Sequence, residues 1–111
     1  MSMNWAKNRE AEVGKLFDLL NSKFSLSKED LISKSRKKEY VHARKIFMNI
    51  LYEVFNPLDK NLVQSDISEI INRDRTSFIH HRKEHLGEYK QYKKYREDYE
   101  CLKKEYEKAI L

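Results

Sequence analysis

Residues 65–85 read SDISEIINRDRTSFIHHRKEH, a pattern that predicts two helices around a tight turn. A short helix from about residue 65 would turn three isoleucines inward: Ile67, Ile70 and Ile71. Residues 72–74 form the turn, in which Asn72 takes the left-handed position usually given to glycine. Asp74 is a favourable N-cap for a second helix that begins near Arg75, because a carboxylate accepts hydrogen bonds from free backbone N–H groups. This arrangement predicts a helix-turn-helix.

The segments before this motif are also predicted to be helical. Residues 4–23 have the apolar spacing of an amphipathic helix, and Ser27 and Asp30 make a capping pair for a short helix that follows. A longer helix over about 38–55 carries the richest apolar set: Tyr40, Val41, Ala43, Ile46, Phe47, Ile50, Leu51, Val54 and Phe55. We expect this helix to be the centre of the core. It ends before Pro57, since proline disfavours helical backbone at the residue before it.

The last segment, residues 86–111, is predicted to be one long charged helix. Its apolar side chains step by three and four residues: Tyr92, Tyr95, Tyr99, Leu102, Tyr106 and Ala109. Three roles are open for this stripe. It completes the core against the N-terminal helix, pairs with a second chain as a short coiled coil, or lets neighbouring lysines lie along DNA. We divide the chain into a helix-turn-helix domain over 1–85 and this helix over 86–111.

The composition agrees with a single all-α domain. The 111 residues include only two glycines and one proline, so long helices are expected and tight β-turns are scarce. Twenty-three Lys and Arg against 18 Asp and Glu give a net charge of +5. A basic domain of this size suits a polyanionic partner such as nucleic acid.

The basic loop, residues 33–38, reads SKSRKK and has no apolar side chain that could face a core. Cations displace the counterions of DNA phosphates, and arginine suits the strongly negative potential of a narrow minor groove. A run of charge is often only a solvated surface. Beside a helix-turn-helix, DNA binding is the favoured interpretation. The candidate contacts in this loop are Lys34, Ser35, Arg36, Lys37 and Lys38.

Other function classes find little support. The lone Cys101 cannot form an internal disulfide, and neither a signal peptide nor an apolar span of about 20 residues is present, so we expect a soluble cytoplasmic protein. His81 and His85 share a helix face but lack further ligands, so no metal is expected. Without a nucleophile–base pair or a glycine-rich phosphate loop, we expect no catalysis and no cofactor.

Two blocks of this sequence resemble the C-terminal DNA-binding domain of the bacterial replication initiator DnaA. Residues 31–48, LISKSRKKEYVHARKIFM, are similar to that family's short helix, basic loop and core helix. Residues 72–81, NRDRTSFIHH, are similar to its signature at the turn into the recognition helix. The blocks occur in the family's order, and the resemblance covers roughly residues 13–86. With only two glycines there is no nucleotide-binding loop, so we expect a stand-alone domain without the initiator's ATPase.

The resemblance implies a Trp-repressor-like fold whose recognition helix lies in the major groove while the basic loop reaches the adjacent minor groove. It assigns Arg36 to the minor groove, and Arg44 and Lys45 to phosphate contacts. It also implies base or phosphate contacts by signature residues: Arg73, Asp74, Thr76, Ser77 and His80. Two further candidates depart from the family's pattern, because Arg75 stands where the family has a histidine and His81 where it has an alanine.

The departure at Arg75 affects the expected DNA target. Arginine bonds bidentately to guanine O6 and N7, whereas histidine offers one nitrogen contact. We therefore expect sequence-specific binding at a site related to the DnaA box but altered in sequence. The process would be replication initiation or its regulation in the nucleoid, for a phage or mobile element, with the host initiator or other replication proteins as partners. The alternative is a protein-interaction module that binds a partner, or a second copy as a homodimer, through residues 86–111.

Overall fold

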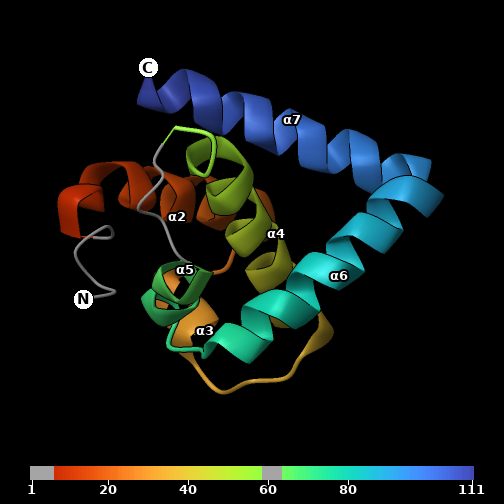
Figure 1. Cartoon of the computed structure of the whole chain (residues 1–111), viewed down its shortest axis with the longest axis horizontal. Helices are drawn as coiled ribbons and strands as arrows, with labels where there is room; N and C mark the ends of the chain where they lie inside the picture. Colours follow the sequence, from red (N-terminus) through yellow and green to blue (C-terminus); the bar gives the residue numbers. More distant parts are fainter. Residues whose placement is uncertain (1–6, 59–63) are drawn as a thin grey trace.

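The computed structural model describes residues 7–58 and 64–111, and all regular structure in these ranges is helical (Figure 1). The predicted all-α class is confirmed. The helices are α2 (Glu10–Phe24), α3 (Lys28–Ile32), α4 (Lys38–Phe55), α5 (Gln64–Ile70), α6 (Arg75–Gln91) and α7 (Lys93–Ile110). The expected helical residues before residue 7, and most of the loop expected over 57–64, lie outside the described residues. Among the described helices, none has the length and hydropathy needed to cross a bilayer.

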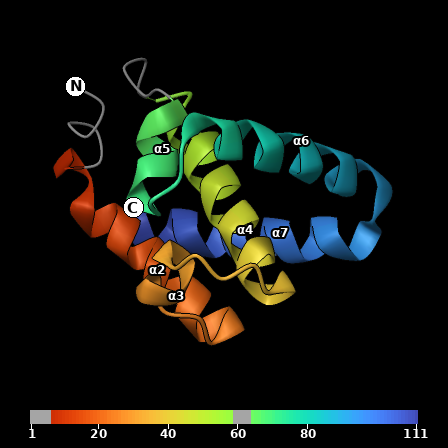
Figure 2. The same cartoon turned by 90° about the horizontal axis from the view of Figure 1, so that it is seen from below.

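Helix α4 is the centre of the fold and has the bounds predicted for it. It contacts each of the other five helices, as Figures 1 and 2 show from two sides. Its buried apolar side chains are Ala43, Ile46, Phe47, Met48, Ile50, Leu51, Val54 and Phe55. Burying a large apolar side chain contributes about 1.5–3 kcal/mol, so covering α4 supplies much of the free energy of folding.

The short helix α3 begins with the predicted capping box. The Ser27 hydroxyl accepts a hydrogen bond from the Asp30 backbone N–H at 3.1 Å, and the Asp30 carboxylate accepts one from the Ser27 N–H at 2.9 Å. These bonds satisfy two backbone donors that have no partner within the helix. They fix where α3 starts, and therefore where the basic loop leaves it.

Helices α5 and α6 form the predicted helix-turn-helix. Phe78 of α6 is buried, with its ring centre 5.2 Å from that of Tyr52 on α4. Its neighbour Ile79 lies outside the core, with its side chain 46% exposed. The next residue of a helix points about 100° further round, which turns Ile79 away from α4.

The prediction of one helix over residues 86–111 is also wrong. Helix α6 continues to Gln91, and Tyr92 has extended backbone (φ −117°, ψ 110°) before α7 begins. A straight helix from residue 75 to 110 would be about 54 Å long at 1.5 Å per residue. The longest extent of the molecule is 36 Å, so the break at Tyr92 lets α7 turn back (Figure 2).

Helix α7 uses its tyrosine stripe to complete the core. Tyr99, Leu102 and Tyr106 are buried, and α7 packs against α2, α4 and α6. The Tyr106 hydroxyl donates to the backbone oxygen of Glu12 in α2 at 2.8 Å. Of the three roles considered for the stripe, the structure has the folded-back one. The division of the chain at residue 85 stays a prediction. Helix α6 runs across that residue, and α7 shares one core with the preceding helices.

Candidate nucleic-acid interface

Helix α6 starts at a turn that leaves its first residues facing solvent. Asn72 has a φ of 58°, in the left-handed region, where its short polar side chain is tolerated. The Asp74 carboxylate accepts a hydrogen bond from the backbone N–H of Ser77 at 3.1 Å and so caps the helix, as predicted. Arg75 and Thr76 are exposed. The start of α6 therefore presents polar side chains beside its positive dipole end.

The basic loop, which ends in the first residue of α4, is held by the side chain of Arg44. The guanidinium donates to the backbone oxygens of Leu31 at 2.8 Å, Ser33 at 2.8 Å and Ser35 at 2.7 Å. Carbonyls at alternate residues thus turn inward to one cation. The charged side chains between and after them are exposed: Lys34, Arg36, Lys37 and Lys38.

Arg73 joins the basic loop to the turn before α6. Its guanidinium donates to the backbone oxygens of Ser33 at 2.5 Å and Ile32 at 3.3 Å. The Ser33 oxygen therefore accepts from both Arg44 and Arg73, and the loop passes below the first turns of α6 in Figure 1. A cleft between them is lined from both sides, by Lys34, Ser35, Arg36, Val41, Arg44, Asn72, Arg73, Ser77 and His81.

The predicted DNA contacts fall into three groups by exposure. The exposed residues are Lys34, Arg36, Lys37, Lys38, Asp74, Arg75, Thr76 and His80. The partly buried residues are Ser35, Arg73 and Ser77. The buried residues are Arg44, Lys45 and His81. The exposed group lies in the basic loop and the first two turns of α6, with Asp74 at the cap.

Arg44 and Lys45, both expected to touch phosphates, have internal partners instead. Arg44 is 3% exposed and its guanidinium is occupied by the loop carbonyls. Lys45 is 7% exposed, and its ammonium pairs with Glu88 of α6 and lies 5.3 Å from the ring centre of Tyr95. A buried cation whose hydrogen-bond donors already have partners has little left to offer a phosphate. These two residues position the loop and α6.

The two adjacent histidines of α6 have different surroundings. His80 is exposed, and its Nε2 lies 3.4 Å from the Glu84 carboxylate. His81 is 8% exposed, and burial lowers its pKa to about 4. His81 is therefore neutral near pH 7 and contributes no positive charge to the cleft. Its Nδ1 has no hydrogen-bond partner among the described residues.

A family comparison matches most of this helical framework. The model of the bacterial dnaA protein helix-turn-helix matches residues 13–84. The chain belongs to this DnaA helix-turn-helix family. Comparisons with curated proteins and with solved structures gave no match. The matched region contains the basic loop, the turn and the first ten residues of α6, and it ends before α7.

Membership of the DnaA family gives the chain's general activity. The family's domain is a DNA-binding module of replication initiation and is not itself catalytic. The surface described above agrees with that activity, since its exposed cations surround the start of the second helix of the motif. Within the described ranges, no group of three His, Cys, Asp or Glu side chains could hold a metal ion.

Two features of the structure were not predicted from the sequence. Lys83 is exposed one turn beyond Ile79 and His80, on the same outward side of α6. Its spacing of three and seven residues from His80 and Thr76 was the available signal. The second feature is Glu53, which lies among apolar residues of α4 and contacts α6 and α7. A single acidic residue inside an apolar pattern gives no indication of its partners.

The substitution Arg44→Lys separates positioning from phosphate binding. Lysine keeps the charge, but its three N–H donors share one nitrogen and cannot reach the carbonyls that the wide guanidinium fork bonds together, so we expect the free energy of unfolding to fall by about 2 kcal/mol or more. Urea unfolding measures this loss, with the exposed Arg36→Lys as a control that changes stability by less than about 0.5 kcal/mol. Unchanged stability, with weaker DNA binding alone, would instead place Arg44 on a phosphate.

Burial of His81 predicts a pH-dependent stability. The unfolded chain takes up a proton near pH 6.5, whereas folded His81 does so near pH 4, so folding is opposed as the pH falls through this window. Between pH 7 and 5, wild type should lose about 1–2 kcal/mol more than His81→Ala. Urea unfolding at both pH values measures this, and His80→Ala should follow wild type. Parallel losses in all three proteins would contradict a neutral, buried His81.

Proposed function

We propose that this chain binds a duplex related to the DnaA box, with the start of α6 in the major groove and the basic loop in the adjacent minor groove. One observation carries the proposal. The exposed cations of the loop and the exposed start of α6 flank one cleft, and Arg73 ties the two segments together. A rigid pair of this kind can engage two neighbouring grooves without first ordering either segment.

Electrostatics favour different contacts for the basic loop and for the start of α6. Lys34, Lys37 and Lys38 are exposed and suit phosphates on either side of the groove. Arg36 is exposed in the middle of the loop, and an arginine is favoured in the minor groove, where the potential is most negative. Thr76 lies near the N-terminal end of α6, where free N–H groups and the helix dipole attract a phosphate.

Base reading is assigned to the outward side of α6. Arg75 and His80 are exposed there, and Lys83 continues this side by one more turn. Arg75 bonded to guanine O6 and N7 would contribute about 1–3 kcal/mol of discrimination against another base. Because the resemblance places a histidine at this position, the target is proposed to differ from the family's usual site at the base that Arg75 meets.

The partly buried and buried residues, together with the exposed Asp74, are assigned supporting roles. Arg73 holds the loop, and Asp74 and Ser77 form the cap of α6. Arg44 holds the basic loop and Lys45 holds α6, both from the buried side, and His81 lines the cleft. Their substitution should weaken DNA binding through the geometry of the surface and not through loss of a phosphate contact.

The proposed process is replication initiation or its regulation in the nucleoid, through recruitment of, or competition with, an initiator at its sites. The alternative, pairing of chains through residues 86–111, receives less support. The apolar stripe that would form a coiled coil is buried against α2 and α4, with Tyr99, Leu102 and Tyr106 in the core. DNA is therefore the partner that the exposed surface favours.

Selection of bound duplexes from a random pool tests this proposal, with wild type and Arg75→His compared. We expect wild type to enrich a motif like the DnaA box with one altered base, and Arg75→His to restore the family's base at that position. Arg36→Ala should weaken binding to the selected duplex and reduce the slope of log affinity against log salt by about one.

The possible results distinguish base reading by Arg75, specific binding without it, nonspecific binding and no binding. A motif unaffected by Arg75→His would remove Arg75 from base reading while leaving specific binding intact. Enrichment of no motif, with salt-dependent affinity for any duplex, would reduce the function to nonspecific DNA binding. Absence of binding at low salt would contradict the proposal altogether.

A further inference from the structure

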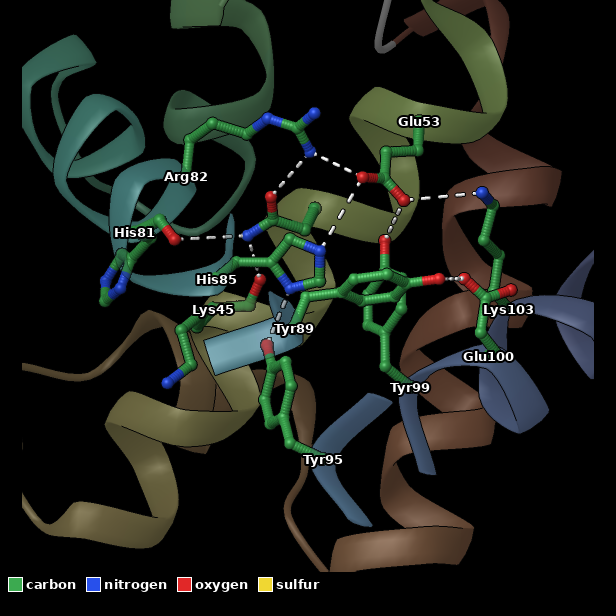
Figure 3. A network of polar contacts seen from close by, with 11 residues as sticks. Lys45, Glu53, His81, Arg82, His85, Tyr89, Tyr95, Tyr99, Glu100 and Lys103 are labelled. Carbon is green, nitrogen blue, oxygen red and sulfur yellow. Dashed lines mark hydrogen bonds and ion pairs between the residues drawn. The ribbon is translucent and has the colours of Figure 1, made fainter. Parts of the chain in front are cut away.

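A polar cluster lies between helices α4, α6 and α7, on the side of α6 that faces the core (Figure 3). We call it the Glu53 cluster, and its members are Glu53, Arg82, His85, Tyr95, Tyr99 and Lys103. None of these residues belongs to the exposed surface proposed to bind DNA. The cluster nevertheless contacts the recognition helix directly, through Arg82 and His85.

The carboxylate of Glu53 is the centre of this cluster. It accepts hydrogen bonds from Arg82 of α6 at 2.7 Å and from Tyr99 of α7 at 2.7 Å. The ammonium of Lys103 donates at 3.3 Å, and His85 Nε2 lies 3.6 Å away. One carboxylate on α4 is thus shared by two residues of α6 and two of α7.

The charges of the cluster keep the carboxylate ionised. Burial alone would raise the pKa of Glu53, but contacts from His85, Tyr99 and Arg82 outweigh it and hold that pKa well below its usual value. Charge-assisted hydrogen bonds are about twice as strong as neutral ones. The hydrogen bonds that join Glu53 to α6 and α7 are therefore strong.

Further bonds extend the attachment along α6. Arg82 also donates to the side-chain oxygen of Asn49 at 3.0 Å, and the Asn49 amide donates to the backbone oxygen of His81 at 3.3 Å. His85 Nδ1 lies 2.7 Å from the hydroxyl of Tyr95 on α7. The part of α6 just after its exposed start is consequently fixed against both α4 and α7.

Helix α7 lies outside the part of the chain that the family model matches, which ends at residue 84. Two of the four groups at the Glu53 carboxylate come from this helix, namely Tyr99 and Lys103. A helix past the matched region thus reaches back to the residue that holds the recognition helix. This contact links α7 to the recognition helix through Glu53, in addition to packing α7 on the core.

We propose that Tyr99, acting through Glu53, positions the recognition helix, so that α7 is a brace that sets the angle of α6 for DNA binding. This inference rests on the proposed DNA-binding function. The brace touches no DNA. It lowers the cost of binding by holding α6 in the orientation that the groove requires.

The alternative is that the Tyr99 contact contributes only to global stability, and the chain contains a matched control for it. Tyr106 is on the same helix, is equally buried and also donates one hydrogen bond, to the backbone oxygen of Glu12 in α2. Tyr106 has no contact with α6 among its hydrogen bonds and ring contacts in the described residues. Tyr99→Phe and Tyr106→Phe each remove one hydroxyl and keep the ring.

The experiment compares these two variants in the full chain, for unfolding by urea, for affinity to the duplex selected by wild type, and for amide hydrogen exchange without DNA. We expect Tyr99→Phe to weaken DNA affinity about fivefold with an unchanged salt slope, because no phosphate contact is lost. Exchange should become faster over residues 79–88. Tyr106→Phe should leave affinity within about twofold and the exchange of α6 unchanged.

If wild type binds the duplex, equal affinities of the two variants, or equal exchange over α6, would overturn the brace. Hydrogen exchange keeps the two proposals apart, since it reads the attachment of α6 without DNA. If exchange differs as expected while wild type binds no duplex, the DNA-binding function fails and Tyr99 holds α6 for another purpose. If wild type binds and the variants have equal affinities or equal exchange, the brace is contradicted while the DNA-binding function stands.

Discussion

Burial of α4 is the constraint on which the other elements depend. This helix is apolar on most of its surface, and five helices are needed to cover it. Polar residues interrupt this cover, and four of them have definite partners: Arg44 holds the basic loop, Lys45 pairs with Glu88 of α6, Asn49 bonds the middle of α6, and Glu53 bonds both α6 and α7. Because an unsatisfied buried polar group is costly, these residues favour one arrangement of the helices over others of similar hydrophobic burial.

The same constraint separates cations with internal roles from cations available to a ligand. Arg44 and Lys45 lie near the start of the buried part of α4, where loop carbonyls accept hydrogen bonds from Arg44 and Glu88 pairs with Lys45. Arg36 and Arg75 lie on the segments that those residues position, and both are exposed. The net charge of the chain is therefore a poor guide to its surface, whereas the partners of each cation separate those used inside the fold from those exposed to solvent.

Local signals in the sequence predicted the elements near the interface well. The Ser27–Asp30 capping box, the end of α4 before Pro57 and the Asp74 cap each depend on neighbouring residues, and the structure contains all of them. The break at Tyr92 was not predictable in this way. No glycine or proline marks it, and its cause is the packing of α7 on distant helices. The internal partners of Arg44 and Glu53 are likewise long-range contacts, which a single sequence does not reveal.

The most direct test of DNA binding by this face is to map backbone amide chemical shifts on a labelled chain as the selected duplex is added. The largest changes should fall in residues 34–38 and 74–84, with residues 100–110 nearly unchanged, and all should weaken together as salt is raised. Changes centred on α7, or spread evenly over the chain, would contradict the assignment of the DNA-binding surface to the basic loop and the start of α6.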